Sequence, residues 1–255
     1  MFYFFFYLII LMRKILILVI VVLLLAVGLG LNFRRRMEMC DGRRVCLYVG
    51  SGAALAEDVK FALDRLEIPC YEVDENFIMS GKLVECCSVL IMPGGYTATY
   101  VSTLAGKGFE NIREFVAEGG EYIGICAGAY IAAEIVEVPG HPKGLGIINI
   151  TNVRRSGMGL VNVKIVGLGD PVVKGYSGVV TMWYQNGPYI IAGEGVDVSA
   201  VYEGGCAAIV HSTYGRGKVV IFSTHPEGSL EGGADPEKLG TIKLLENAIR
   251  FGKDP

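Results

Sequence analysis

Residues 122–130 read Tyr-Ile-Gly-Ile-Cys-Ala-Gly-Ala-Tyr, an apolar run that passes through small residues into an alanine-rich segment. The pattern predicts a strand that ends before Cys126 and a helix that begins after it. A cysteine at such an elbow stands above the end of a sheet, with the following backbone N–H groups directed at its side chain. These groups favour a thiolate and a developing oxyanion. We therefore interpret Cys126 as a candidate nucleophile, with a buried cysteine of no chemical role as the alternative.

A second segment supplies a candidate base. Residues 224–227, Thr-His-Pro-Glu, follow the apolar run Val-Val-Ile-Phe at 219–222. At a strand end or tight turn, an imidazole and a carboxylate two positions apart can serve as a base and the group that orients it. We expect His225 to take the thiol proton and Glu227 to hold the imidazole in its useful tautomer. An incidental surface loop is the alternative.

Two glycines, Gly94 and Gly95, follow the apolar run at 89–92. Because glycine has no side chain, backbone N–H groups at this point can approach a ligand closely. Together with the N–H of Ala127, they are expected to bind the oxyanion of a tetrahedral intermediate. A plain turn is the alternative for the two glycines.

Strands and helices alternate in the first half of the domain. The expected order is strand 45–49, helix 53–67, strand 69–73, strand 89–92, helix 109–118 and strand 122–125. This alternation predicts a parallel sheet with helices on both faces. The second half is expected to be rich in short strands, with a hairpin turn and a terminal helix. The strands are 161–166, 179–183, 190–192, 200–202, 207–212 and 218–223; the turn is 214–218 and the helix 236–251.

These motifs resemble those of the class I glutamine amidotransferase superfamily: the Gly-x-Cys-Ala-Gly elbow, the His-Pro-Glu pair and the Pro-Gly-Gly loop at 93–95. Residues 92–96 and 183–187, together with the chain length, are most similar to the domain found at the N-terminus of some biotin-protein ligases and in stand-alone proteins. The similarity covers roughly residues 43–251. It implies a flavodoxin-like α/β fold and a Cys-His-Glu triad, here Cys126, His225 and Glu227.

The N-terminal region is predicted to be a membrane anchor. Residues 15–33 form an uninterrupted uncharged run, and as a helix this run would reach about 28 Å, close to the ~30 Å thickness of the hydrocarbon core. The three arginines at 34–36 are typical of a stop-transfer anchor that contacts phospholipid headgroups. We expect one transmembrane helix within an anchor at 1–36, a linker at 37–42 and the amidotransferase-like domain at 43–255.

Composition argues against several other kinds of site. The 255-residue chain has 23 basic and 26 acidic residues, and part of the basic charge flanks the apolar run, so the domain itself is acidic and is not predicted to bind nucleic acid. His141 lies in a turn-rich loop and His211 in an alternating strand; we expect the first to be solvated and the second to be structural. The histidines and cysteines form no recognisable metal-ligand pattern. No cofactor is predicted.

The seven cysteines show no pairing pattern. An odd number at scattered positions, several of them within apolar runs, predicts buried reduced thiols, including the adjacent Cys86 and Cys87, which are expected to be structural. Reduced thiols and the basic residues at 34–36 favour the cytoplasmic side of a single-pass anchor in the cell membrane. If translation starts at Met12, the chain resembles a signal peptide or an anchor that places the domain outside.

The sequence therefore predicts a membrane-anchored protein that hydrolyses or transfers an amide through a thioester. The expected partners are membrane lipid at residues 15–33, a small amide-bearing substrate and an unidentified synthetase or other protein. The last is expected because a glutaminase normally passes its ammonia to a synthase and this sequence shows no synthetase module. It also lacks the Gly-Arg-Gly-Arg-x-Gly loop of a biotin ligase, so the resemblance does not predict biotin ligase activity.

Two alternative functions stay open. One is a non-catalytic module that uses the elbow as a pocket for a small ligand or a partner protein. The other is an enzyme that resembles PfpI-type peptidases and deglycases, which typically draw their histidine from next to the cysteine. In this chain Ala127 occupies that place and His225 is available downstream, so the amidotransferase pattern is favoured.

Overall fold

The computed structural model describes residues 44–137, 140 and 143–251. Its central sheet contains five parallel strands in the order β2-β1-β3-β4-β11. This order is that of a doubly wound, flavodoxin-like sheet. The strands are β1 (Arg44–Tyr48), β2 (Cys70–Val73), β3 (Cys87–Met92), β4 (Glu121–Ile125) and β11 (Gly217–Phe222). The predicted parallel sheet is therefore confirmed.

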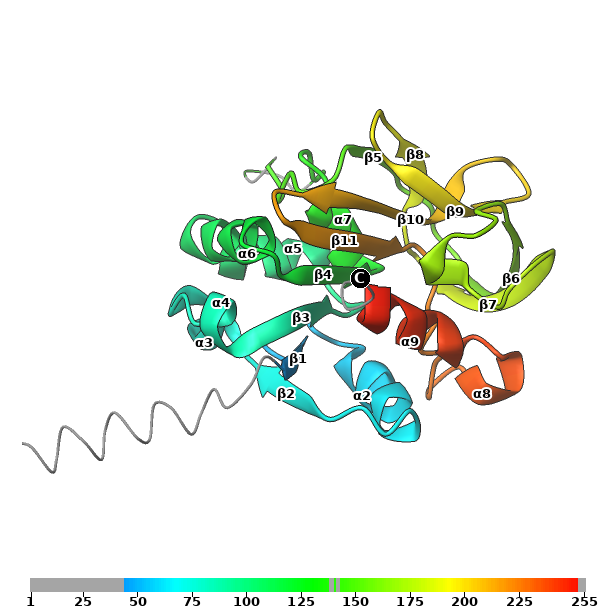
Figure 1. Ribbon diagram of the computed structural model, residues 1–255, viewed down its shortest axis with the longest axis horizontal. Helices are drawn as coiled ribbons and strands as arrows, with labels where there is room; N and C mark the ends of the chain where they lie inside the picture. Colours follow the sequence, from blue (N-terminus) through cyan, green and yellow to red (C-terminus); the bar gives the residue numbers. More distant parts are fainter. Residues whose placement is uncertain (1–43, 138–139, 141–142, 252–255) are drawn as a thin grey trace, which may run out of the picture. The chain divides into compact units, whose positions relative to one another are not determined.

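Helices cover both faces of this parallel sheet. Every residue of β4 is buried, and such a continuous apolar strand requires cover on both sides. Figure 1 shows α2 and α9 on one face and α5, α6 and α7 on the other. The bounds of these helices are α2 (Ala56–Arg65), α5 (Thr97–Leu104), α6 (Lys107–Ala117), α7 (Ala127–Ala132) and α9 (Ile242–Phe251).

The helices differ from the prediction in two places. Sequence periodicity missed α3 (Glu75–Met79), α4 (Leu83–Cys86) and α5, which are too short to show a clear apolar stripe. The predicted terminal helix is divided into α8 (Pro236–Leu239) and α9. Gly240 separates them with a φ of +71°, the left-handed conformation with which glycine ends many helices.

The second half of the domain is rich in strands, as predicted, and these strands extend the sheet with antiparallel pairs. Strand β10 (Ala207–Tyr214) pairs with β11, and β9 (Asp197–Tyr202), β6 (Met158–Ile165) and β7 (Val179–Gln185) follow in that order. A further pair joins β5 (Ile150–Val153) to β8 (Tyr189–Ala192), which also contacts β10. The polar strand β5 was not predicted. This second half supplies one wall of the candidate site.

The prediction of reduced thiols is wrong for three cysteines. Cys46 and Cys87 form a disulfide bond, with their Cα atoms 5.9 Å apart, and Cys86 is also disulfide-bonded. Cys46 and Cys87 can form their bond because β1 and β3 are adjacent parallel strands with a register irregularity at Arg44. The two cysteines are 41 residues apart in the sequence, and this spacing alone does not reveal that the strands are neighbours. Cys70, Cys126 and Cys206 are free thiols. The cysteines thus no longer support a reducing compartment.

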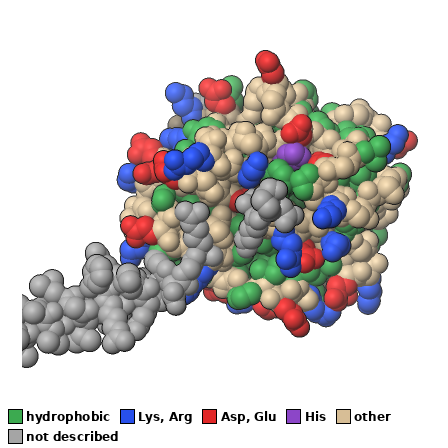
Figure 2. Space-filling view, in the orientation of Figure 1, with side chains coloured by type: hydrophobic (Ala, Val, Ile, Leu, Met, Phe, Trp, Pro, Cys, Tyr) green, Lys and Arg blue, Asp and Glu red, His purple; other side chains and the backbone are tan. Residues whose placement is uncertain are grey.

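The predicted transmembrane helix at 15–33 lies outside the described residues. Among the residues that the structure describes, no helix has the length and apolar character needed to cross a membrane. Figure 2 shows acidic and basic side chains interspersed over the visible face of the domain. A concentrated basic surface is the usual mark of a nucleic-acid-binding protein, and the interspersed charge on this face differs from it.

Candidate active site

Cys126 lies at a sharp turn between β4 and α7, as predicted. Its φ of +51° and ψ of −100° are strained for a residue with a side chain. The glycines two positions to either side permit the turn. A Cβ atom on Gly124 would lie 2.7 Å from the Gly128 carbonyl oxygen, and one on Gly128 would lie 2.1 Å from the Met92 carbonyl oxygen. The cysteine is 5% exposed, so its thiol lies at the bottom of a surface opening.

His225 and Glu227 follow the end of β11 and are almost completely buried. The histidine Nδ1 lies 2.8 Å from the Glu227 Oε1, which fixes the ring orientation. The backbone N–H of His225 donates to the Trp183 carbonyl at 2.8 Å, anchoring the segment to β7. The other ring nitrogen, Nε2, is buried without a hydrogen-bond partner among the described residues. The arrangement leaves Nε2 available for proton transfer.

Cys126 and His225 both lie next to Gly94. A Cβ atom on Gly94 would lie 2.9 Å from the His225 Cε1 and 3.5 Å from the Cys126 Cβ, so the glycine packs against both. Burial disfavours a charged imidazole, but the Glu227 carboxylate and the Cys126 thiol outweigh it and hold the pKa of His225 well above its ordinary value. Burial raises the pKa of Glu227, with His225 acting in the opposite direction. The structure therefore brings together the three predicted triad residues.

The predicted oxyanion groups are close to this centre. The N–H groups of Gly94 and Gly95 make no hydrogen bond within the part of the chain that the structure describes. Gly95 admits no side chain, because its Cβ would lie 2.0 Å from the Gly52 carbonyl oxygen. Ala127 begins α7 directly after the cysteine. These positions suit backbone donors for a negatively charged oxygen.

The end of β7 completes the surroundings of the thiol. The Cys126 Sγ donates a hydrogen bond to the Gln185 carbonyl at 3.2 Å. The next residue, Asn186, has a φ of +56°, and its carbonyl accepts a hydrogen bond from the Tyr130 hydroxyl at 3.2 Å. Burial raises the pKa of Tyr130 to about 12, so this hydroxyl stays protonated at neutral pH. The segment at 183–187 thus lies beside the nucleophile.

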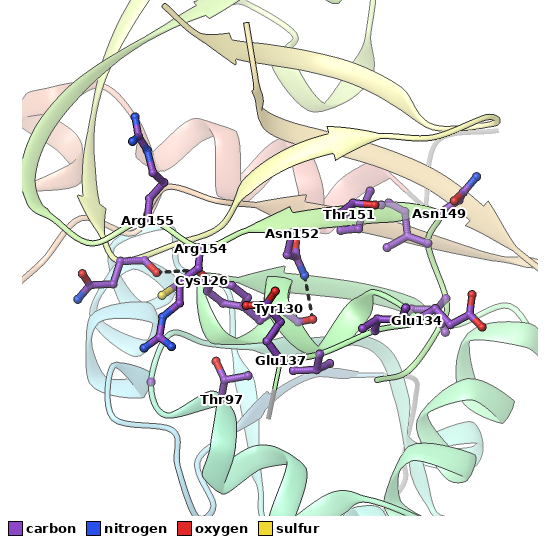
Figure 3. A pocket seen from close by; sticks show the side chains of 18 of the residues that line it. Thr97, Cys126, Tyr130, Glu134, Glu137, Asn149, Thr151, Asn152, Arg154 and Arg155 are labelled. Atoms are coloured by element: carbon purple, nitrogen blue, oxygen red, sulfur yellow. Dashed lines mark hydrogen bonds between the residues drawn. The ribbon is translucent and has the colours of Figure 1, made fainter. Parts of the chain in front are cut away.

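A large cleft opens above Cys126, with a volume of about 1430 Å³. Figure 3 shows Arg154 and Thr97 close to the thiol, with Tyr130 and Asn152 farther along and Asn149 and Thr151 at the other end. The adjacent Arg155 turns away and stacks over the Tyr189 ring at 4.8 Å. Sequence reasoning missed Arg154, because nothing in its loop indicated that it faces the cleft.

Asp58 is a further residue that sequence reasoning missed. It lies in the first turn of α2, is 6% exposed and accepts a hydrogen bond from the Leu230 N–H at 2.9 Å. Burial raises the pKa of Asp58, and the charge of Asp58 in turn helps to raise the pKa of Glu227. A signal was present: the acidic Asp58 stands three positions after the apolar Leu55 and four before Ala62, on their side of the helix.

The other two histidines lie apart from this centre. His141 falls outside the described residues. His211 in β10 is buried, and its Nε2 lies 3.1 Å from the Asp170 Oδ2. This contact links β10 to the loop before the short helix Pro171–Val173. No group of three or more metal-ligating side chains occurs within the described residues.

Comparisons with known proteins identify the relatives of this domain. The family model "Biotin-protein ligase, N terminal" matches residues 43–150, which include the Gly94 loop and the Cys126 elbow. The pyridoxal 5'-phosphate synthase subunit PdxT of Koribacter versatilis is 35% identical over 140 residues, which cover 54% of this chain and 67% of that subunit. The chain belongs to the class I glutamine amidotransferase superfamily. The resemblance predicted from its motifs is confirmed.

Two more similarities cover a larger share of the chain. A biotin-protein ligase of Schizosaccharomyces pombe is 26% identical over 233 residues, covering 79% of this chain but only 36% of the ligase. The structure of PurLQS from Thermotoga maritima aligns with a TM-score of 0.63 over 82% of this chain and 98% of the matched chain, at 16% identity. At that identity the likeness concerns the fold alone, and it includes the strand-rich half that carries His225.

Proposed function

We propose that the domain cleaves a carboxamide through a thioester on Cys126. The observation that carries the proposal is the convergence of a strained cysteine, a buried His225–Glu227 pair 2.8 Å apart and unbonded N–H groups at Gly94 and Gly95. These are a nucleophile, an oriented base and an oxyanion site, the three components that acyl transfer requires. Membership of the amidotransferase superfamily supports the same chemistry.

The first half of the reaction forms the thioester. The Cys126 proton passes to His225, and the sulfur attacks the carbonyl carbon of the amide. The resulting oxyanion is bound by the N–H groups of Gly94, Gly95 and Ala127. The C–N bond then breaks, and His225 returns its proton to the nitrogen, which leaves as ammonia or an amine. Glu227 stabilises the imidazolium during both transfers.

The second half regenerates the thiol. A water molecule gives a proton to His225 and attacks the thioester carbonyl, forming a second oxyanion at the same N–H groups. The C–S bond breaks, the carboxylic acid departs and the proton on His225 returns to sulfur. If an acceptor amine replaces water, the same sequence transfers the acyl group.

We further propose that the released nitrogen is used by a partner protein. The relative from Koribacter versatilis is named as a subunit of a synthase, which supports a protein partner for this domain. Membrane attachment through residues 15–33 remains a proposal based on their uncharged sequence and length.

Thiol reactivity tests the proposed triad without knowledge of the substrate. We expect limiting iodoacetamide to modify Cys126 before Cys70 and Cys206, as measured by peptide mass spectrometry. His225→Ala should slow this reaction at pH 7, since a charged imidazole stabilises the attacking thiolate. Glu227→Gln should slow it less, because the glutamate acts through the histidine.

Two outcomes would contradict the proposal. One is preferential labelling of Cys70 or Cys206, and the other is an unchanged rate at Cys126 in the His225→Ala protein. The matched control is His211→Ala, which removes a buried histidine far from the thiol. Ammonia release from candidate amides, lost in Cys126→Ser, then distinguishes an enzyme from a module that only binds ligands.

A further inference from the structure

The cleft above Cys126 continues well beyond the reacting centre. We define its distal arm as Asn149, Glu194, Val196 and Ser212. These four residues line the same cleft as Cys126. Hydrogen bonds hold the arm together: the Asn149 Nδ2 donates to the Glu194 carbonyl at 3.2 Å. Strand pairing sets His211 opposite Asp197, which places Ser212 beside Val196. The arm is therefore a continuous surface built from three segments.

The distal arm is too far from Cys126 for one free amino acid to occupy both. Ser212 pairs with Val219, and Val219 pairs with Tyr122, four residues before Cys126. At ~3.3 Å per residue and ~4.8 Å per strand, Ser212 lies about 13 Å along the sheet and about 10 Å across it from the thiol. In glutamine, the amide carbon and the α-nitrogen are four bonds of ~1.5 Å apart, less than about 6 Å.

A buried hydroxyl without a partner marks the arm as a binding surface. Ser212 is 7% exposed, and its Oγ has no hydrogen-bond partner among the described residues. Halfway along the cleft, the Oδ1 of Asn152 is likewise buried and unpartnered, while its Nδ2 donates to the Tyr130 carbonyl at 3.1 Å. Buried polar atoms normally have partners. Both atoms can accept a hydrogen bond from a ligand.

The charges along the cleft are not distributed evenly. Its basic side chains, Arg154 and Arg155, belong to the loop near Cys126, and four glutamates, Glu134, Glu137, Glu194 and Glu231, also line the cleft. Glu134 lies at the far end of the cleft from Arg154, and Glu194 adjoins Asn149 of the distal arm. Figure 3 shows Arg154 and Glu134 at opposite ends of the view. The distal arm thus offers acceptors and negative charge, the complement of an ammonium or guanidinium group.

We propose that the distal arm binds a cationic group carried on the same molecule as the amide that Cys126 attacks. The substrate class is a peptide or peptide-like conjugate, about five extended residues long over the ~16 Å between the two points. This inference rests on the proposed function, because it names the substrate of that reaction. A cleft of about 1430 Å³ exceeds the roughly 300–1,000 Å³ of ordinary small-molecule pockets and accommodates such a chain.

The first experiment tests the arm independently of the reaction. In a Cys126→Ser background, Ser212→Cys is treated with cationic 2-(trimethylammonio)ethyl methanethiosulfonate or anionic 2-sulfonatoethyl methanethiosulfonate. We expect the cationic reagent to react about tenfold faster, after normalisation to free cysteine. Glu134→Gln combined with Glu194→Gln should remove most of this preference, whereas Glu203→Gln, an exposed residue outside the cleft, should not. Val196→Cys provides the same measurement if Ser212→Cys does not fold.

The second experiment links the arm to Cys126. Chloroacetamides that carry a terminal ammonium or a terminal carboxylate on a chain of about 15 Å are compared for their rate of Cys126 alkylation. We expect the ammonium reagent to react about tenfold faster, and a short ammonium reagent to show no such advantage.

The proposal for the distal arm would be overturned by equal rates for the cationic and the anionic reagents. It would also be overturned if neither Ser212→Cys nor Val196→Cys reacted with either methanethiosulfonate. Failure of the proposed function has a different signature, since Cys126 alkylation by iodoacetamide would then not depend on His225.

Discussion

Removal of the Cys46–Cys87 disulfide is expected to destabilise the domain strongly. The bond closes a loop of 41 residues, and the chain-entropy relation gives about 3.9 kcal/mol at 25 °C for a loop of that length. Both sulfur atoms are buried, and losing their contacts adds on the order of 0.8 kcal/mol for each group. The Cys46→Ala, Cys87→Ala double variant should therefore lose about 5 kcal/mol. For a domain of this size, the melting temperature should fall by roughly 10 to 20 °C.

The assay is urea unfolding followed by tryptophan fluorescence, with calorimetry for the melting temperature. Because the double variant removes both thiols, no new free cysteine complicates the comparison. Cys206→Ala is the matched control, since Cys206 is a partly buried free thiol, and it should lose less than about 1 kcal/mol. A loss below about 1 kcal/mol in the double variant would refute the reasoning, because it would show that the bond does not constrain the unfolded chain.

Three further predictions concern other parts of the structure. Asp58→Ala removes the acceptor of the partly buried Leu230 N–H hydrogen bond and should lower the free energy of unfolding by about 1–3 kcal/mol. Asp58→Asn keeps an acceptor and should lower it by less; urea unfolding measures both. Burial acts to raise the pKa of Asp170, but hydrogen bonds from His211 and Ser199 outweigh it and lower this pKa. The ionised carboxylate therefore stabilises the folded domain above the unfolded pKa of about 3.9, and this stabilisation is lost as the pH falls through the lower folded pKa. The free energy of unfolding of the Asp170→Asn variant should accordingly be lower than that of the wild type at pH 7, and it should fall less than that of the wild type below pH 4. A wild-type free energy of unfolding that does not change with pH would contradict this. Finally, disulfides persist in oxidising compartments, so intact cells quenched with iodoacetamide should yield the Cys46–Cys87 peptide pair on mass spectrometry; free, alkylated Cys46 and Cys87 would instead favour the cytoplasmic side.

The local geometry of the site was largely predictable because it depends on contiguous residues. Small residues on both sides of Cys126 are required for the turn, and they stand next to it in the sequence. His225 and Glu227 are two positions apart, so their hydrogen bond follows from one short segment. The parallel strands were predictable for the same reason, since burial on both faces produces continuous apolar runs.

The features that sequence reasoning missed depend on contacts between distant segments. Cys46 meets Cys87 only because two parallel strands become neighbours. Arg154 and Ser212 reach the cleft from a loop and a strand whose local patterns are ordinary. Asp58 gave a local sign, an acid within an apolar helix face, but its partner Leu230 lies 172 residues away. Such pairings arise from the tertiary fold, and no short-range pattern encodes them.

The strained backbone of Cys126 lowers the overall stability of the domain. A residue with a side chain at φ +51° and ψ −100° carries strain of about 1–3 kcal/mol, which is a noticeable part of the 5–15 kcal/mol that holds an ordinary domain together. Glycine would adopt the same turn with little strain. The fold therefore gives up stability to present one thiol, and the sulfur that we propose as the nucleophile coincides with a point where the backbone is strained.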